Sequence, residues 1–251
     1  MEWADSIGAD VISSSLCYID WYTYSDLDGN TAVTTQAADI AAERGIVVCN
    51  AMGNSGPGSG TLMAPADADS ILACGAVNSS GYLASFSSRG PSFDGRTKPE
   101  VCARGVSTRC ASPYNLNGYT TASGTSLSTP LIGGCAALIL SARPYWTPMQ
   151  VREAMMMTAS RATYPDNNYG WGIPDLLAAI QYSFYITGDV TGDGEVDIAD
   201  VIYLIHYLYL GGPSPDPLFL GDVNCDDLVN IGDVVYLLNY LFLGGPEPCT
   251  H

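Results

Sequence analysis

The 251-residue sequence is poor in basic side chains and in histidine. It has 9 Lys and Arg against 26 Asp and Glu, and its only two histidines are His206 and His251. The formal net charge of −17 argues against nucleic-acid binding, which needs a basic surface, and favours cations as partners. Both histidines lie in an acidic C-terminal segment, so the first two thirds of the chain contain no imidazole.

Three further patterns are absent. No run of about 18 apolar residues occurs, so no membrane span is predicted, and Leu131 to Ala142 is interpreted as a buried helix. The first residues lack the basic flank and apolar stretch of a signal peptide, so either the chain is cytosolic or its true N-terminus lies upstream. No Cys-x-x-Cys pair is present, which argues against a zinc or thioredoxin-type site.

Seven of the eight cysteines fall into two groups. Cys49, Cys74 and Cys135 lie in apolar runs and are predicted to be free, buried thiols. In an oxidising compartment Cys102 could bridge with Cys110, and Cys225 with Cys249, but the spacing alone does not determine the connectivity.

Charge divides the chain into two parts. Residues 1–184 carry 15 acidic and 9 basic residues, whereas residues 185–251 carry 11 acidic residues and no Lys or Arg. Together with the length, this predicts two domains, at residues 1–182 and 188–251, joined by a linker at residues 183–187.

The first part alternates short apolar runs with helical patterns, which predicts an α/β fold with a mostly parallel sheet and flanking helices. Gly45 is well placed to end the first helix, and Pro148 stands in the first turn of the last one. The expected strands are residues 10–13, 46–51 and 71–77, and the expected helices are residues 31–44, a helix that follows Ser126 and ends near Ala142, and residues 148–158.

The second part is an internal repeat. Gly-Asp-Val opens one copy at Gly188 and the other at Gly221, and each copy closes with Leu-Gly-Gly-Pro. Each copy has an acidic loop followed by an apolar helix, and two such helices should pack against one another to bury their apolar faces. A small all-α domain is therefore expected.

Two segments of the first part carry candidate catalytic residues. Ser126 lies in Gly-Thr-Ser-Leu-Ser-Thr-Pro at the expected start of an apolar helix, where free N–H groups and the helix dipole favour negative charge. Asn54 lies on a glycine-rich loop and offers a side-chain amide as an oxyanion donor. Taken singly, either motif is a routine turn, so their weight depends on the order of the surrounding segments.

That order resembles the subtilase family of serine endopeptidases over nearly all of residues 1–180. The resemblance implies that Ser126 is the nucleophile, that Asn54 helps to hold the oxyanion, and that the substrates are proteins or peptides. It also implies a primary specificity pocket flanked by Ser15, Leu16 and Cys17 on one side and by Ala51, Met52 and Gly53 on the other, with Cys17 where the family often has Gly. The segments that carry the resemblance are residues 2–4, 10–16, 53–56, 64–66, 86–91, 98–101, 124–130 and 169–172.

The catalytic Asp and His motifs of that family, which precede the strand expected at Asp10, have no counterpart here. Without a base the Ser126 hydroxyl stays protonated, so we expect this chain alone to be inactive. His206 is an improbable replacement because it lies in the middle of a helix of the repeat, and His251 is terminal. Two hypotheses follow: Met1 is internal to a longer secreted protease, or the first domain is a remnant in a non-catalytic, calcium-dependent binding protein.

The repeat offers oxygen ligands at the spacing of calcium loops, which use positions 1, 3, 5, 7, 9 and 12 with glycine preferred at position 6. The first loop has Gly194 at position 6, and the second has Asp227, a residue type that tolerates left-handed backbone. Two Ca²⁺ sites are predicted. Their ligands are Asp189, Thr191, Asp193, the Glu195 carbonyl, Asp197 and Asp200 in the first loop, and Asp222, Asn224, Asp226, the Leu228 carbonyl, Asn230 and Asp233 in the second.

A helix only after each loop, and Asp at position 12, distinguish these loops from full EF-hands, and residues 186–247 resemble a dockerin domain. The resemblance implies a cohesin-type partner and a secreted or cell-surface location. Loop positions 10 and 11, which help to select the cohesin in that family, are Ile198-Ala199 and Ile231-Gly232 here. Without calcium the crowded carboxylates should repel, so we expect this domain to be largely unfolded.

Overall fold

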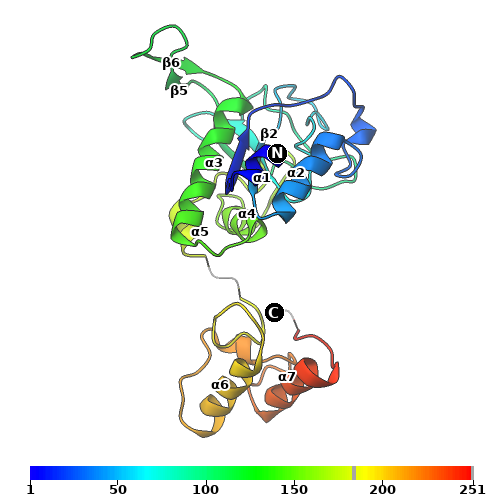
Figure 1. Cartoon of the computed structure of the whole chain (residues 1–251), viewed down its shortest axis with the longest axis vertical. Coiled ribbons are helices and arrows are strands. Elements are labelled where there is room, and N and C mark those ends of the chain that lie inside the picture. The colour runs from blue at the N-terminus through cyan, green and yellow to red at the C-terminus, as the bar shows by residue number, and fades with distance from the viewer. Residues whose placement is uncertain (183–184, 250–251) are drawn as a thin grey trace. The chain divides into compact units, whose positions relative to one another are not determined.

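The computed structural model describes residues 1–182 and 185–249, and the chain divides into two compact units, residues 1–182 and 183–251 (Figure 1). Residues 183 and 184 of the predicted linker, and His251, lie outside the described residues. Within the second unit, Tyr185 makes an edge-to-face contact with Phe219, and Thr187 is buried. These two residues of the predicted linker therefore pack onto the second unit.

A four-stranded parallel sheet of order β1-β2-β3-β4 forms the centre of the first unit. Its strands are β1 (Val11–Ser14), β2 (Val47–Ala51), β3 (Leu72–Val77) and β4 (Val101–Arg104). The first three confirm the predicted strands to within two residues at each end. The fourth was not predicted, because a four-residue run ending in Arg becomes a strand only through its pairing with β3.

Helices cover both faces of this sheet. Ile12 packs into the cluster formed with α2 (Val33–Glu43), whereas its neighbour Ser13 lies against Gly133 of α3 (Thr125–Ala142). Since adjacent strand residues point to opposite faces, α2 and α3 lie on opposite sides of the sheet. All residues of β2 and β3 are buried as a result, which explains their continuous apolar sequence.

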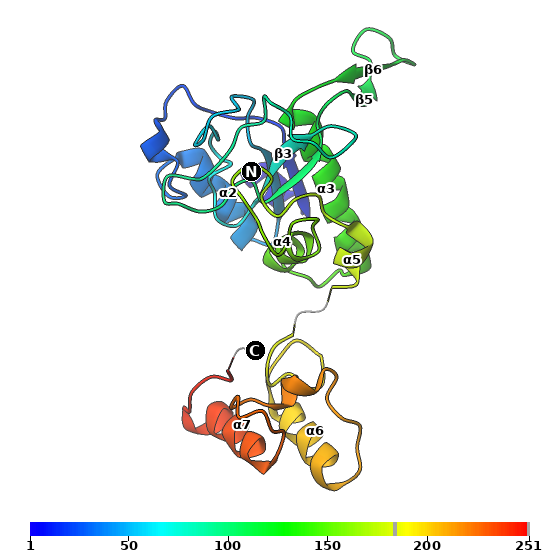
Figure 2. The same cartoon turned by 180° about the vertical axis from the view of Figure 1, so that it is seen from behind.

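The remaining helices of the first unit are short (Figure 2). They are α1 (Glu2–Ser6), the 3₁₀ turn η1 (Tyr24–Asp26), α4 (Pro148–Met157) and α5 (Leu176–Ile180). A Thr147–Gln150 capping box opens α4, with Pro148 in its first turn.

By length and composition α3 is the one helix among the described residues that could cross a membrane. Its residues contact all four strands of the sheet, however. Only one face of α3 is buried, through residues such as Ile132, Ala136 and Ile139, whereas Leu131 and Leu138 are exposed, so the prediction of a buried helix over Leu131 to Ala142 holds for the face on the sheet alone.

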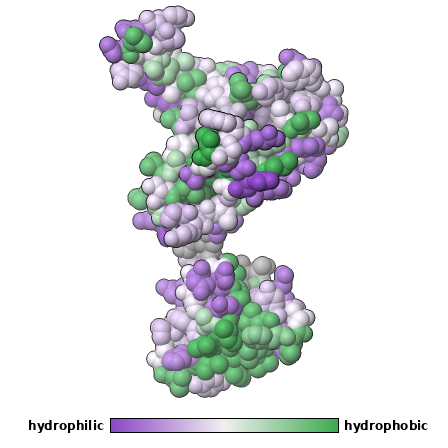
Figure 3. All heavy atoms as spheres, in the orientation of Figure 1, coloured by the Kyte–Doolittle hydropathy of each residue, from purple (hydrophilic) through white to green (hydrophobic). Residues whose placement is uncertain are grey.

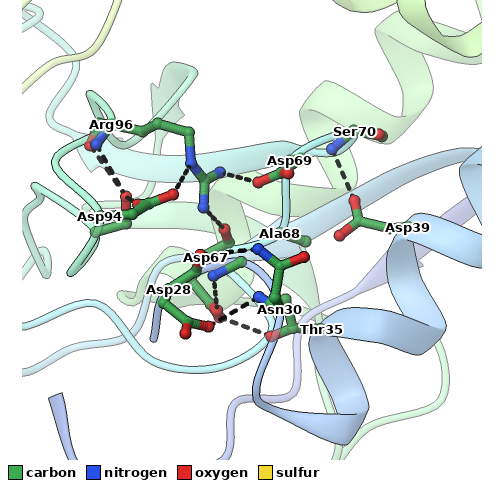
Figure 4. A network of polar contacts seen from close by, with 12 residues as sticks. Asp28, Asn30, Thr35, Asp39, Asp67, Ala68, Asp69, Ser70, Asp94 and Arg96 are labelled. Carbon is green, nitrogen blue, oxygen red and sulfur yellow. Dashed lines mark hydrogen bonds and ion pairs between the residues drawn. The ribbon is translucent and has the colours of Figure 1, made fainter. Parts of the chain in front are cut away.

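A polar network joins the loops on the α2 side of the unit (Figure 4). Arg96 pairs with Asp94 and Asp69 and donates to the carbonyl of Asp67. The buried Asp67 carboxylate accepts from the Gly29 N–H and from the Thr35 hydroxyl. Because both Asp67 carboxylate oxygens accept a hydrogen bond, the network holds the loop before α2 against the segment between β2 and β3 without an unsatisfied buried oxygen at Asp67.

Two buried charged residues, Lys98 and Glu100, connect the segment just before β4 to neighbouring segments. Lys98 Nζ donates to Glu100 Oε1 at 2.7 Å and to the Ala68 carbonyl at 2.6 Å. Arg152 Nη2 reaches the same Glu100 oxygen at 2.9 Å, and the second Glu100 oxygen accepts from Ala73 N. Burial lowers the pKa of Lys98, and its charge is tolerated because Glu100 compensates it.

An antiparallel hairpin of β5 (Thr108–Ala111) and β6 (Tyr119–Ala122) leads into α3 and was not predicted. It places Cys110 on an outlying ribbon, whereas Cys102 is buried in β4. Both thiols are free, so the Cys102–Cys110 bridge considered from the sequence is wrong. Cys49 and Cys74 are buried free thiols as predicted, whereas Cys135 is free but only half-buried.

The second unit contains α6 (Ile198–Tyr209), the 3₁₀ turn η2 (Leu218–Gly221) and α7 (Ile231–Leu243). The two helices pack against one another, as the repeat predicted. Their inner faces meet in one apolar core, whose buried members are Val190, Val201, Leu204, Leu220, Val223, Val234 and Leu237.

Candidate functional site

Ser126 lies at the second position of α3, at the carboxyl ends of the parallel strands. Gly124 is the N-cap residue and has φ 153°, a backbone conformation that side chains disfavour. The backbone N–H of Ser126 is at a helix position that has no intrahelical acceptor. The start of α3 therefore offers one N–H donor and the positive end of the helix dipole beside the Ser126 hydroxyl.

The Asn54 side chain is oriented by Thr125. Asn54 Oδ1 accepts from the backbone N–H of Thr125 at 2.9 Å and lies 3.2 Å from the Thr125 hydroxyl. A backbone N–H can only donate, so the carbonyl side of the amide must be the side that faces Thr125. The Asn54 NH₂ group thus remains available as a donor. It lies close to the Gly124 backbone, because its nitrogen is 3.6 Å from the position that a Cβ on Gly124 would take.

Two reciprocal hydrogen bonds join Ser126 to the end of β1. The Ser126 hydroxyl donates to the Ser15 carbonyl at 3.0 Å, and the Ser15 hydroxyl donates to the Ser126 carbonyl at 2.9 Å. The structure thus brings the predicted nucleophile next to one of the predicted pocket segments. In this arrangement the hydroxyl proton of Ser126 is directed at a main-chain carbonyl, which cannot act as a base.

The two predicted pocket segments are adjacent. Cys17 Sγ lies 3.1 Å from the Ala51 carbonyl, and the Asn50 amide donates to the carbonyls of Leu16 and Ala51. Met52 is buried. Burial raises the pKa of the Cys17 thiol to about 11, so this thiol is neutral at ordinary pH.

Sequence reasoning missed two residues that build this region. Asn50 joins the pocket segments, and Ser128 accepts from Ala103 N and donates to the Gly75 carbonyl, which fixes α3 to β3 and β4. A polar residue inside an apolar strand was the signal for Asn50. Ser128 carried no such signal, because its partners are distant in the sequence.

The first acidic loop curls around Asp189. The Asp189 carboxylate accepts the backbone N–H groups of Gly192, Asp193 and Gly194 at 2.8 to 3.1 Å. At the other end of the loop Asp197 is the N-cap of α6, and Asp200 completes a capping box with it. Two predicted calcium ligands thus also start the helix.

The second loop repeats this arrangement. Asp222 accepts the N–H groups of Asp226 and Asp227 at 3.1 and 2.9 Å, and Asn230 with Asp233 forms the capping box of α7. Asp227 has φ 64° where the first loop has Gly194 at φ 94°. The left-handed conformation predicted for Asp227 at position 6 is therefore present.

Both loops bury carboxylates. Asp200 and Asp233 are fully buried, and Asp189 and Asp222 nearly so. Burial raises the pKa of Asp200 and of Asp233, and the neighbouring carboxylate of Asp189 or Asp222 adds to the effect in each case. A bound cation would reverse this penalty, so the donor set fits a hard divalent metal ion.

Within residues 1–182 and 185–249, no three Asp, Glu, His or Cys side chains converge tightly enough to hold a metal by themselves. Calcium loops also draw on carbonyl, amide and hydroxyl oxygens, which here come from Glu195 and Leu228, from Asn224 and Asn230, and from Thr191. A Cys225–Cys249 disulfide links position 4 of the second loop to the C-terminal segment. The second of the two bridges considered from the sequence is thus present.

The helices of the second unit also present apolar side chains outward, and Figure 3 shows an apolar area on this unit. Ile198, Ile202 and Tyr209 on α6 are exposed, as are their repeat equivalents Ile231, Val235 and Phe242 on α7. The apolar residues at loop position 10 are therefore part of a longer exposed row on each helix.

Comparison with known proteins agrees with this geometry, since residues 1–172 match the subtilase family. The chain belongs to the subtilase family. Residues 187–242 match the dockerin type I domain. Both resemblances inferred from the sequence are confirmed, as is the fold class of an α/β subtilisin-like unit with a small helical domain.

Individual relatives of this subtilase are bacterial. Subtilisin E of Bacillus subtilis (strain 168) is 42% identical over 185 residues, which cover 72% of this chain and 43% of the relative. Subtilisin DY of Bacillus licheniformis is 41% identical over 183 residues, which cover 72% of this chain and 60% of the relative. The chain thus spans about half of the length of these relatives.

Among solved structures, the prenylagaramide maturation protease PagA superposes with a TM-score of 0.58 at 28% identity. The self-cleaved protease domain of PatA gives a TM-score of 0.58 at 26% identity. Each match covers 72% of this chain and 64% of the other. The subtilase unit described here therefore corresponds to part of a subtilisin-like protease domain.

Proposed function

We propose that this subtilase is part of a serine endopeptidase, in which the Ser126 hydroxyl attacks the carbonyl carbon of the cleaved peptide bond and forms an acyl-enzyme. The observation that carries the proposal is the junction of Asn54, Thr125 and Ser126 at the start of α3. There the Asn54 NH₂ group and the Ser126 N–H are two donors for a developing oxyanion. Ser15, Leu16 and Cys17, facing Ala51, Met52 and Gly53, form the pocket for the residue before the cleaved bond.

Residues 1–182 of this chain do not hydrolyse peptides by themselves in this proposal. They contain no histidine, and the Ser126 hydroxyl donates to a carbonyl instead of to a base. A neutral serine hydroxyl is a weak nucleophile without an adjacent base. The complete enzyme would supply an imidazole and its orienting carboxylate from a further segment of protein.

The second unit serves as a calcium-dependent anchor in the same proposal. Dockerin type I domains bind calcium. We assign one calcium ion to each loop, with the six ligands predicted for that loop. The matching capping boxes of α6 and α7 and the burial of Asp200 and Asp233 support this assignment. The anchored partner is a cohesin-type module, and the location is extracellular or at the cell surface, in keeping with the Cys225–Cys249 disulfide.

A second function from another class has one observation in its favour. Ser126 is hydrogen-bonded to Ser15 and residues 1–182 contain no histidine, so in this second function the first unit is a non-catalytic remnant in a calcium-dependent binding protein. The two functions differ in whether Ser126 becomes reactive once a base is supplied.

The decisive experiment labels Ser126 with a fluorophosphonate. The chain is fused to the preceding segment of a subtilisin relative, which carries an Asp and a His motif, and labelling is compared with the unfused chain and with the fused Ser126→Ala variant. Labelling that needs both the fusion and Ser126 supports the protease. A folded fusion that stays unlabelled refutes it and supports the binding protein.

A further inference from the structure

The β5–β6 hairpin is a two-stranded ribbon that extends away from the sheet (Figures 1 and 2). Most residues of both strands are exposed or half-exposed, so the ribbon has no apolar face buried in the unit. A hairpin without a third strand or a packed face is marginally stable in water. A polypeptide that paired with the ribbon or covered it would therefore stabilise it.

The far end of this ribbon carries large apolar side chains that are exposed to solvent. The relative exposure is 97% for Tyr114, 103% for Leu116 and 70% for Tyr119. Scattered single apolar residues on a surface need no explanation, but Tyr114 and Leu116 both lie in the turn that closes the ribbon, with Tyr119 at the start of β6 just below it. The Arg109 guanidinium lies 4.6 Å from the Tyr119 ring and stiffens the ribbon below the tip.

The base of the ribbon is fastened beside Ser126. Gly124 N donates to the Gly105 carbonyl at 2.8 Å, and Ser107 N donates to the Ser123 hydroxyl at 2.9 Å. The last residue of β6 precedes Ser126 by four positions. At roughly 3.3 Å per residue the ribbon spans on the order of 20 Å from Ser126 to its tip, which is the length of about six residues of an extended chain.

Charge separates this region from the rest of the protein. Residues 101–126, which include the ribbon and the start of α3, contain two arginines, Arg104 and Arg109, and no Asp or Glu, in a chain of net charge −17. An extended polypeptide of neutral or acidic composition meets no like charge along the ribbon and the first turns of α3. The strands also leave outer edges whose backbone groups can pair with such a chain.

We propose that the β5–β6 hairpin is a substrate arm that binds an extended, unfolded polypeptide through apolar or aromatic side chains at its tip. The assignment rests on the proposed protease function, because the ribbon leads directly from its tip to Ser126. The arm would favour long polypeptides over short peptides, since only a chain of about six residues or more beyond the reacting bond reaches Tyr114 and Leu116.

The test measures binding without any chemistry. The chain 1–251 is titrated into fluorescein-labelled, reduced and carboxymethylated α-lactalbumin, a permanently unfolded polypeptide, and fluorescence anisotropy gives the Kd. The tip variant is Tyr114→Ser with Leu116→Ser. The matched control is Tyr145→Ser, which removes an equally exposed ring (96%) elsewhere in the same unit. Circular dichroism checks that all variants are folded.

We expect the tip variant to bind at least about tenfold more weakly, because it loses both apolar contacts, and Tyr145→Ser to bind as wild type. Tyr114→Phe with Leu116→Met keeps the apolar tip and should keep the affinity. Equal affinity of the tip variant and wild type would overturn the proposal of a substrate arm. The proposal would also be overturned if Tyr145→Ser lost as much affinity as the tip variant. Tip-dependent binding together with failed fluorophosphonate labelling of the fused chain would overturn only the proposed hydrolysis.

Discussion

Replacing Gly194 by Ala tests the coupling of calcium to the second unit. Gly194 stands at position 6 of the first loop with φ 94°, and a Cβ added there would meet no atom within 4 Å. The substitution therefore creates no steric clash. Its cost is confined to holding an L-residue in left-handed backbone, about 1 to 2 kcal/mol.

That cost appears as a loss of calcium affinity. If the loop folds only when the ion binds, the strain in the bound state subtracts directly from the free energy of binding. At about 1.4 kcal/mol per factor of ten, a strain of 1 to 2 kcal/mol weakens the first site by roughly 5- to 30-fold. The second loop has its own ligands and should keep its affinity.

Calcium titration of the chelator-treated chain measures this shift. The helical circular-dichroism signal of α6 and α7 reports folding, and calorimetry separates the two sites. The matched control is Gly134→Ala in α3, where an added Cβ also meets nothing within 4 Å but the backbone is helical. This control should stabilise the first unit by up to about 1 kcal/mol and leave the calcium titration unchanged.

Two results would refute the reasoning. An unchanged calcium midpoint in Gly194→Ala would mean that the left-handed turn is not part of the metal-bound state. A second unit that keeps its helical signal in excess chelator would mean that folding and calcium binding are not coupled.

Three further outcomes are expected. In the fused, active enzyme, Asn54→Leu should lower kcat by ~10²- to 10³-fold with KM little changed, a loss that is already known for removing such a donor in a subtilisin. Cys17 should alkylate slowly with iodoacetamide below about pH 10, because its pKa is raised from the ordinary 9.0 to about 11, and mass spectrometry of the modified peptide follows the rate. Glu100→Gln should reduce the free energy of unfolding of the first unit by about 3 to 5 kcal/mol in urea denaturation, because Lys98 at 1% exposure would lose its counter-ion and must then either keep an uncompensated buried charge or give up its proton.

The last two of these have a control within the chain. For Glu100→Gln it is Asp5→Asn, which removes the exposed Arg44–Asp5 pair at 3.7 Å and should cost less than about 1 kcal/mol. For Cys17 the control is the same thiol in the chain unfolded by denaturant. Equal alkylation rates in the folded and the unfolded chain would contradict the raised pKa of Cys17. An unchanged kcat in Asn54→Leu would show that the Asn54 side chain does not stabilise the oxyanion.

The sequence by itself determined the class of each unit. Apolar runs at residues 46–51 and 71–77 predicted buried parallel strands because both faces of such strands are covered, and the repeat at Gly188 and Gly221 predicted two loop–helix units. The paired positions of Asp197 with Asp200 and Asn230 with Asp233 also follow from local rules, since they start helices as capping boxes. Local signals suffice where a residue's partner is only a few positions away.

Tertiary structure decided what depends on partners distant in the sequence. The strand β4 and the β5–β6 hairpin form by pairing that their own short sequences do not specify. Cys102 and Cys110 are eight positions apart, yet one lies in the sheet and the other on the ribbon, so their spacing suggested a bridge that the fold forbids. The contacts of Ser126 with Ser15, of Asn54 with Thr125 and of Asn50 with Leu16 likewise join segments that only the packing of α3 onto the parallel sheet brings together.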